Sequence, residues 1–146
     1  MNTLLIFIWI YLAMVSLSFV EAYVEGRNLW DKNKVGWKLK LVKGYVITGY
    51  HFYLFSLMIP LFLTLPLIIY RWDKRLFGIL LSAYFSGIVI EDFFFFIVSP
   101  VVKFREFRTG ITDYYPWIKY KGKKIIPAGY IILAGMSVLS WYFLWR

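Results

Sequence analysis

The chain has 146 residues, of which 61% are hydrophobic, and a net charge of +9; its mean hydropathy is +0.65. Soluble domains are about 45–50% apolar, so this composition excludes both an ordinary soluble domain and a disordered chain. The absence of cysteine excludes disulfides and thiolate metal sites, and a single histidine excludes a histidine-only zinc site or a bis-histidine haem site within one chain. The class that remains is an integral membrane protein with a basic surface.

Four continuous apolar segments are long enough to cross a bilayer, which requires about 20 helical residues. They cover approximately residues 3–23, 49–70, 76–99 and 125–145. Continuous runs indicate helices, whereas the strands of a membrane barrel would alternate. The first segment lacks the positive start and cleavage site of a signal peptide, which favours a spanning helix. The sequence therefore predicts an all-α integral membrane protein, a four-transmembrane-helix bundle with residues 1–146 as one transmembrane domain.

The segments between these helices differ strongly in charge. The two long loops, near residues 26–48 and 100–124, hold thirteen of the 17 basic residues, and the opposite side holds the other four. Positive loops of membrane proteins stay in the cytoplasm. We therefore expect a multi-pass protein of the plasma membrane with cytoplasmic long loops and both termini outside. Because this topology accounts for the basic charge, no nucleic-acid partner is expected.

Local patterns also predict details of the loops and of helix packing. Apolar and basic residues alternate at positions 37–41, and aromatic residues accompany lysines at 115–120. This pattern predicts short strands that could pair as a small β-hairpin cap, or segments that lie on an anionic leaflet. Pro60 and Pro66 should bend the second helix, because each lacks a backbone donor. The fourth helix has small residues suited to close helix contacts: Ala128, Gly129, Ala134, Gly135, Ser137 and Ser140.

Acidic residues inside the apolar segments are the main functional signal. Glu91 and Asp92 lie within the third segment, and eight residues, about 12 Å of helix, separate Asp92 from Pro100. A carboxylate at such a depth costs about 2–3 kcal/mol and requires a partner, a proton or a polar cavity. Adjacent residues point about 100° apart on a helix, and we expect Glu91 to be the one that faces inward.

The predicted topology brings three more polar residues to the same membrane depth. Glu21 and Glu25 share one face at the end of the first helix, because they are four residues apart. His51 lies in the first turn of the second helix. Together with Glu91 and Asp92 they form a cluster of carboxylates with the single histidine of the chain, in the cytoplasmic leaflet.

Three hypotheses account for this cluster. Carboxylates and an imidazole are ordinary ligands of iron, manganese and zinc, so Glu21, Glu25, His51, Glu91 and Asp92 are candidate ligands of a divalent transition metal. Such a site would serve membrane redox or lipid chemistry, although the Glu-x-x-His pair of di-metal helix bundles is absent. Crowded carboxylates could instead form a proton or ion pathway. The third hypothesis is a structural network, in which Glu91 or Asp92 pairs with His51, with Arg27 or with a loop lysine.

Short motifs along most of the chain resemble those of a family of small, uncharacterised four-helix membrane proteins of bacteria and archaea. The motifs are Glu25-Gly26 with Gly36-Trp37, then Gly49-Tyr50-His51, Glu91-Asp92-Phe93 with the run to Pro100, and Tyr115-Pro116-Trp117 before Pro127. The last loop departs from that family at Ile118, where the resemblance implies a second histidine. The family has no known activity, so the resemblance supports the site and implies no reaction.

The segment 90–96 also resembles the acidic, aromatic helix of heterodimer-type lycopene cyclases. This local resemblance implies an isoprenoid enzyme that uses carboxylates for proton-driven ring closure. A rival interpretation is non-catalytic: an accessory subunit of a larger membrane complex, or a homo-oligomer, in contact with the lipid bilayer. The small size of the protein, its many aromatic residues and the small residues of the fourth helix suit that role equally well.

Overall fold

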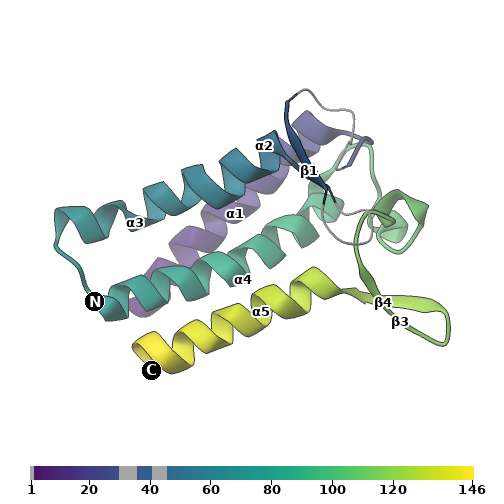
Figure 1. The fold of residues 1–146 in the computed structure, drawn as a ribbon. Coiled ribbons are helices and arrows are strands. Elements are labelled where there is room, and N and C mark those ends of the chain that lie inside the picture. Colours follow the sequence, from purple (N-terminus) through teal and green to yellow (C-terminus); the bar gives the residue numbers. More distant parts are fainter. Residues whose placement is uncertain (1, 30–35, 41–45) are drawn as a thin grey trace.

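The computed structural model describes residues 2–29, 36–40 and 46–146. Within these residues, four long helices lie side by side, and both termini lie at the end of the bundle opposite the strands (Figure 1). The first helix is α1 (Thr3–Glu25) and the third is α4 (Lys74–Val98). The second begins as α2 (Gly49–His51), continues through the π-helical stretch η2 (Phe52–Met58) and ends as α3 (Ile59–Ile69). The fourth is α5 (Ala128–Ser140), which ends in a second π-helical stretch, η5 (Trp141–Trp145). All four are long and apolar enough to cross a membrane, which confirms that part of the prediction.

Two helices begin two or three residues away from their predicted starts, each for a local reason. The third helix begins at Lys74 rather than near residue 76, because the Asp73 carboxylate caps it and accepts hydrogen bonds from the backbone N–H groups of Arg75 and Leu76 at 2.7 and 3.0 Å. The fourth helix begins only at Ala128. Residues 125–127, predicted as helix, belong to a strand that pairs with the preceding segment.

Each long loop contributes its own antiparallel hairpin. Strand β1 (Lys38–Lys40) pairs with β2 (Val46–Thr48), and β3 (Trp117–Tyr120) pairs with β4 (Lys123–Pro127). The prediction of short strands within residues 37–41 and 115–120 is therefore confirmed for 38–40 and 117–120, whereas Trp37, Tyr115 and Pro116 lie outside the strands and Leu41 lies outside the described residues. Within the described residues each strand pairs inside its own loop and not as one shared cap. Lys121 and Gly122, both at positive φ, form the tight turn between β3 and β4.

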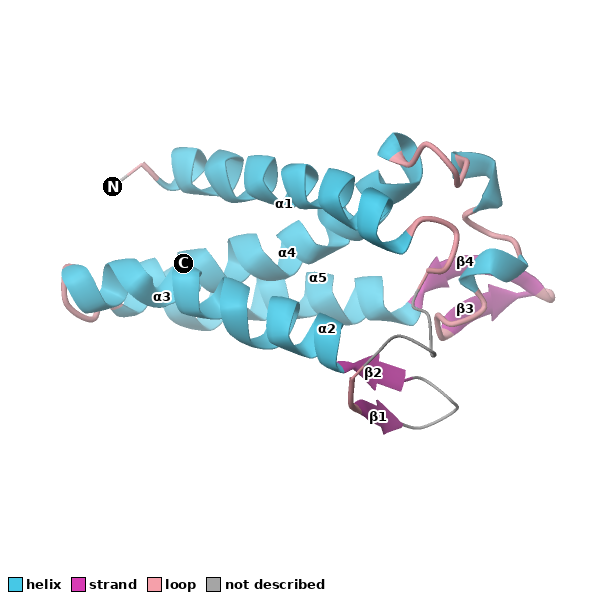
Figure 2. Ribbon diagram, turned by 90° about the horizontal axis from the view of Figure 1, so that it is seen from above, coloured by secondary structure: helices cyan, strands magenta, loops and turns pink. Residues whose placement is uncertain are grey.

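The two hairpins lie at the same end of the bundle (Figure 2). Strand β2 leads directly into α2, and β4 leads directly into α5. Two short 3₁₀ turns, η3 (Phe104–Glu106) and η4 (Gly110–Thr112), lie between α4 and β3. The described parts of the two basic loops therefore lie around the helix ends where the acidic cluster was predicted.

Arg27 connects the two loops. Its guanidinium forms an ion pair with Glu106 at 2.8 Å and donates a hydrogen bond to the Val101 carbonyl at 2.6 Å. The backbone N–H of Lys103 and then the Arg27 guanidinium lower the pKa of Glu106 below its usual value. Arg27 thus pairs with an acid of the second loop, and not with Glu91 or Asp92 as one hypothesis expected.

Helix α4 is central, because α1, α3 and α5 all pack against it. Buried apolar side chains from α1, α3 and α4 form the core on one side: Ile10, Met14, Leu67, Leu80, Ala83 and Tyr84. On the other side, Ser82 and Ser137 exchange hydrogen bonds with each other's backbone carbonyls at 2.9 and 2.8 Å, which joins α4 to α5. The predicted close contacts therefore involve Ser137 and Ser140, whereas Ala134 and Gly135 are exposed.

Gly78 is the point of closest approach between α4 and the C-terminal end of the chain. A Cβ atom at this position would lie 2.5 Å from Cβ of Leu144 and 2.9 Å from Cδ1 of Trp145. Because Leu144 Cβ is attached directly to the backbone, an added Cβ atom at position 78 fits only if α4 and η5 move apart. At Gly135, by contrast, a Cβ atom would meet nothing within 4 Å.

We therefore expect Gly78→Ala to lower the free energy of unfolding by about 1–3 kcal/mol, the cost of overpacking a close contact. Gly135→Ala is the matched control and should change stability by less than about 1 kcal/mol, in the stabilising direction, because alanine favours a helix. Unfolding of both variants in mixed detergent micelles measures the difference. Equal stabilities would contradict the close contact at Gly78.

Pro60, the first of the two prolines in α3, changes the hydrogen bonding of the helical stretch before it. Pro60 has no N–H for the carbonyl four residues earlier, and the preceding stretch is π-helical: the Ile59 N–H bonds to the Leu54 carbonyl. The Phe55 carbonyl, which an α-helix would pair with Ile59, accepts a hydrogen bond from the Tyr84 hydroxyl of α4. A neighbouring helix thus satisfies a backbone group that the proline region leaves open.

Candidate functional site

His51 is held by the residue that caps its own helix. Thr48 precedes α2, and its Oγ1 accepts from the backbone N–H of His51 at 3.5 Å and shares a hydrogen bond with His51 Nδ1 at 2.7 Å. The ring of Phe55, one turn later, stacks on the imidazole with centroids 6.4 Å apart. These contacts fix the orientation of the ring and direct Nε2 toward α1.

Helix α1 presents Glu21 and Glu25 to this imidazole. His51 Nε2 lies 3.5 Å from Oε1 of Glu25, and the Tyr50 hydroxyl donates a hydrogen bond to Glu21 Oε1. Oxygen atoms of the two carboxylates and a nitrogen of the imidazole all lie within 4.8 Å of one another. The three side chains are only 5–9% exposed. The structure therefore brings together three of the five predicted ligands.

Glu91 and Asp92 lie next to this group but outside that set of ligand atoms. Both line a small cavity of about 40 Å³ together with Glu21, Glu25 and His51. Glu91 is 5% exposed, in keeping with the expectation that it faces inward, and its backbone carbonyl accepts a hydrogen bond from Ser18 of α1 at 2.7 Å.

Asp92 has a different environment from the other three acids and the histidine of the cluster. Its two carboxylate oxygens accept hydrogen bonds from the hydroxyls of Tyr115, in the last loop, and Tyr130, in α5. Burial, followed by the negative charge of Asp92, raises the pKa of Tyr115 well above its usual value, so this hydroxyl remains a donor. Asp92 thus joins α4 to two segments that follow it in the chain.

A larger cavity of about 390 Å³ begins at the same polar group. His51, Glu91 and Asp92 line both the small and the large cavity, and Tyr115 lines the large one. The remaining wall of the large cavity is mostly apolar and comes from η2, α4 and α5. The polar cluster therefore lies between a small cavity at α1 and a larger, mostly apolar cavity at α5.

Sequence reasoning missed four residues that shape this site. Thr48 and Tyr50 lie beside His51, and Tyr50 belongs to the Gly-Tyr-His motif already noted, so the motif was a usable signal. Tyr115 begins the Tyr-Pro-Trp motif of the second long loop, so that motif was a usable signal as well. Tyr130 gave no signal, because one more aromatic residue in an apolar helix is indistinguishable from residues that face lipid.

Comparison of the chain with protein-family models, with curated proteins and with solved structures gave no match. The geometry of the cluster is therefore the basis for a functional assignment.

Proposed function

We propose that the protein is an integral protein of the plasma membrane that binds a divalent transition metal ion between Glu21, Glu25 and His51. The observation that carries this proposal is the approach of three buried ligand atoms, from two helices far apart in sequence, to within 4.8 Å of one another. Ligands at about 2.1 Å from one ion lie about 3.4 Å apart in a tetrahedral site, so the three atoms would have to approach one another by about 1 Å. Small rotations of the side chains would close that difference.

The surroundings of the histidine support a metal site. Metal-bound histidines usually use their second ring nitrogen for a hydrogen bond that fixes the ring, and the Thr48 hydroxyl occupies that position on Nδ1. Two carboxylates and one imidazole suit iron, manganese or zinc. Three protein ligands leave coordination positions for a substrate, which is the arrangement of catalytic rather than structural metal sites.

The proposal includes an orientation in the membrane. The hairpin end of the bundle carries most of the basic residues, and the positive-inside rule assigns this end to the cytoplasm. Both termini would then lie outside. The metal site would lie in the cytoplasmic leaflet, within reach of the apolar chains of membrane lipids.

Metal analysis of the purified protein tests the proposal. After supply of iron, manganese or zinc and removal of the excess, we expect about one ion per wild-type chain and less than about a tenth of that in Glu25→Ala and His51→Ala, because each loses a ligand. Thr48→Val keeps all three ligands and should weaken binding by about 10–100-fold. Asp113→Ala removes an exposed carboxylate outside the site, 70% accessible, and serves as the matched control.

Wild-type protein without stoichiometric metal under these conditions would refute the metal site. Loss of metal in Asp113→Ala as well as in His51→Ala would point to adventitious binding by surface acids.

A second candidate function is that of an accessory subunit, and the outer face of α5 favours it. Ala134 and Gly135 are exposed there, and space for a Cβ atom is open at Gly135. Small exposed residues allow another membrane helix to approach closely. Copurification of a defined set of larger membrane subunits in mild detergent, together with absence of metal, would support this function over the first.

A further inference from the structure

Two cavities lie next to each other along α4 and together define a groove. The larger cavity, of about 390 Å³, and a second of about 340 Å³ share the lining residues Phe55, Ser56 and Ile88. One wall comes from η2 and α3, the floor from α4, and the opposite wall of the larger cavity from α5. We refer to this combined space as the α4 groove.

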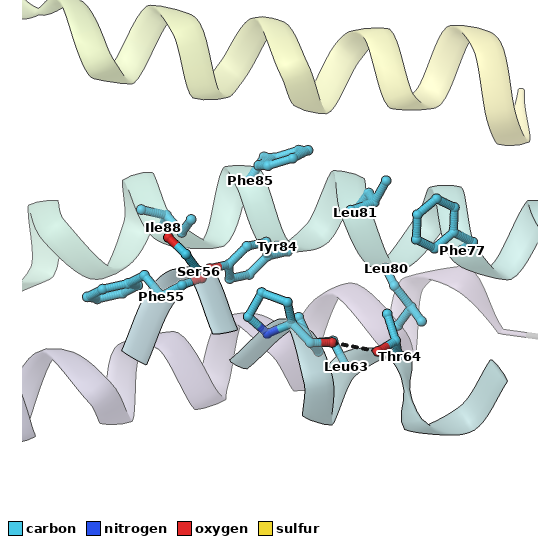
Figure 3. A pocket seen from close by; sticks show the side chains of 11 residues that line it. Phe55, Ser56, Leu63, Thr64, Phe77, Leu80, Leu81, Tyr84, Phe85 and Ile88 are labelled. Atoms are coloured by element: carbon cyan, nitrogen blue, oxygen red, sulfur yellow. Dashed lines mark hydrogen bonds between the residues drawn. The ribbon is translucent and has the colours of Figure 1, made fainter. Parts of the chain in front are cut away.

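The α4 groove is polar at one end only. His51, Glu91, Asp92 and Tyr115 line the end near the hairpins. The other end is lined mostly by apolar side chains of α3 and α4, among them Leu63, Phe77, Leu80, Leu81 and Phe85 (Figure 3). Pro60 also lines it, and Ser56, Thr64 and Tyr84 contribute its polar groups. A ligand that matches this lining has a polar head and one long apolar chain.

The polar end contains an acceptor without a donor. Glu91 is 5% exposed, yet none of the residues that the structure describes donates a hydrogen bond to its carboxylate. No fully buried side-chain nitrogen or oxygen of the described residues lacks a hydrogen-bond partner, so the Glu91 carboxylate keeps some accessible surface. A carboxylate with so little access to water is costly unless a hydrogen bond satisfies it. Because Glu91 lines the large cavity, a donor on a bound molecule can reach it from the groove.

We propose that the α4 groove binds a membrane lipid with a single long hydrocarbon chain, whose hydroxyl head donates a hydrogen bond to Glu91. Cavities of about 300–1,000 Å³ are typical of small-molecule sites, and a cavity of about 150 Å³ already holds a benzene ring. The groove lies along segments long and apolar enough to span a membrane, and Ile132, 62% exposed, lies at its edge, so the surrounding lipid has access to it.

This inference rests on the membrane insertion included in the proposed function, but not on the metal. If the protein binds both the metal and the lipid, the lipid hydroxyl lies beside the metal ligand His51, which lines the same cavity. A hydroxylated lipid is then the substrate class of the metal site. Metal-depleted protein should still bind the lipid. The two proposals can therefore fail separately.

The test uses hexadecanol that carries a photoreactive diazirine on its chain, added to the full-length, chelator-treated protein in lipid nanodiscs. After irradiation, peptide mass spectrometry locates the labelled segments. We expect labels concentrated in residues 55–64 and 77–88, and competition by unlabelled hexadecanol about tenfold stronger than by its methyl ether, which has no donor for Glu91.

Two variants and a control complete the experiment. Leu81→Trp fills the apolar end and should reduce labelling at least fivefold, whereas Leu12→Trp, on an exposed face of α1, should not change it. Glu91→Met keeps the length of the side chain without the acceptor and should abolish the preference for the alcohol over the ether. Three results would each overturn the proposal. These are labels spread over all lipid-facing segments, equal competition by the alcohol and the ether in the wild type, and crosslinks to a second chain in the groove.

Discussion

Replacement of Asp92 with alanine is expected to lower the free energy of unfolding by about 3 kcal/mol. The reason is that its carboxylate accepts hydrogen bonds from two tyrosine hydroxyls, Tyr115 in the last loop and Tyr130 in α5. Hydrogen bonds to a charged group contribute about 1.5–3 kcal/mol each, and both hydroxyls would lose their partner in one step. Because the two tyrosines follow α4 in the chain, the loss should loosen the β3–β4 hairpin and α5 together.

A mutant cycle separates this effect from a general weakening. Tyr115→Phe and Tyr130→Phe should each cost about 1–2 kcal/mol in the wild-type background and much less when Asp92 is already alanine. Reversible unfolding in mixed micelles gives the free energies, and hydrogen exchange of β3 and β4 reports the loosening. An Asp92→Ala protein within about 0.5 kcal/mol of the wild type would show that the two hydrogen bonds contribute nothing to stability.

The four helices were predictable because continuous apolar runs of this length have few alternatives. The ends of the helices were less predictable, because each end depends on single side chains. The Asp73 carboxylate, for example, caps α4 and starts it earlier than the hydropathy suggests. The hairpins were predictable as strands from alternation, but alternation carries no information about the partner strand. In the structure each strand pairs with its nearest neighbour in the chain, which requires the shortest loop closure.

The candidate site was predictable to the extent that topology determines depth. Helix ends that lie on the same side of a membrane reach the same level, and this argument alone brought Glu21, Glu25 and His51 together. It did not predict the partners of Glu91 and Asp92, because side chains about 100° apart on one helix meet different neighbours. Asp92 faces Tyr115 and Tyr130, and only the tertiary packing of α5 makes that visible.

Phe96→Ala is expected to cost about 3–5 kcal/mol, the largest single effect among these predictions. The Phe96 side chain is 2% exposed and lies in a buried aromatic cluster beneath the loops, with ring centroids 5.2 Å from Phe95 and 4.9 Å from Phe107. The same cluster includes Ala22 of α1 and Val102 of the second loop. An alanine would leave a cavity where α1, α4 and that loop meet.

Phe62→Ala provides the matched control, since Phe62 lies in α3 with 68% of its surface exposed and should cost less than about 1 kcal/mol. The comparison isolates burial, because both changes remove the same ring from a helix within a predicted span. Unfolding in mixed micelles measures both variants. The cluster also supports the end of α1 that carries Glu21 and Glu25, so Phe96→Ala should weaken metal binding although it removes no ligand. Equal costs for the two variants would contradict a packed core at this end of the bundle and place Phe96 against lipid, as hydropathy alone suggests.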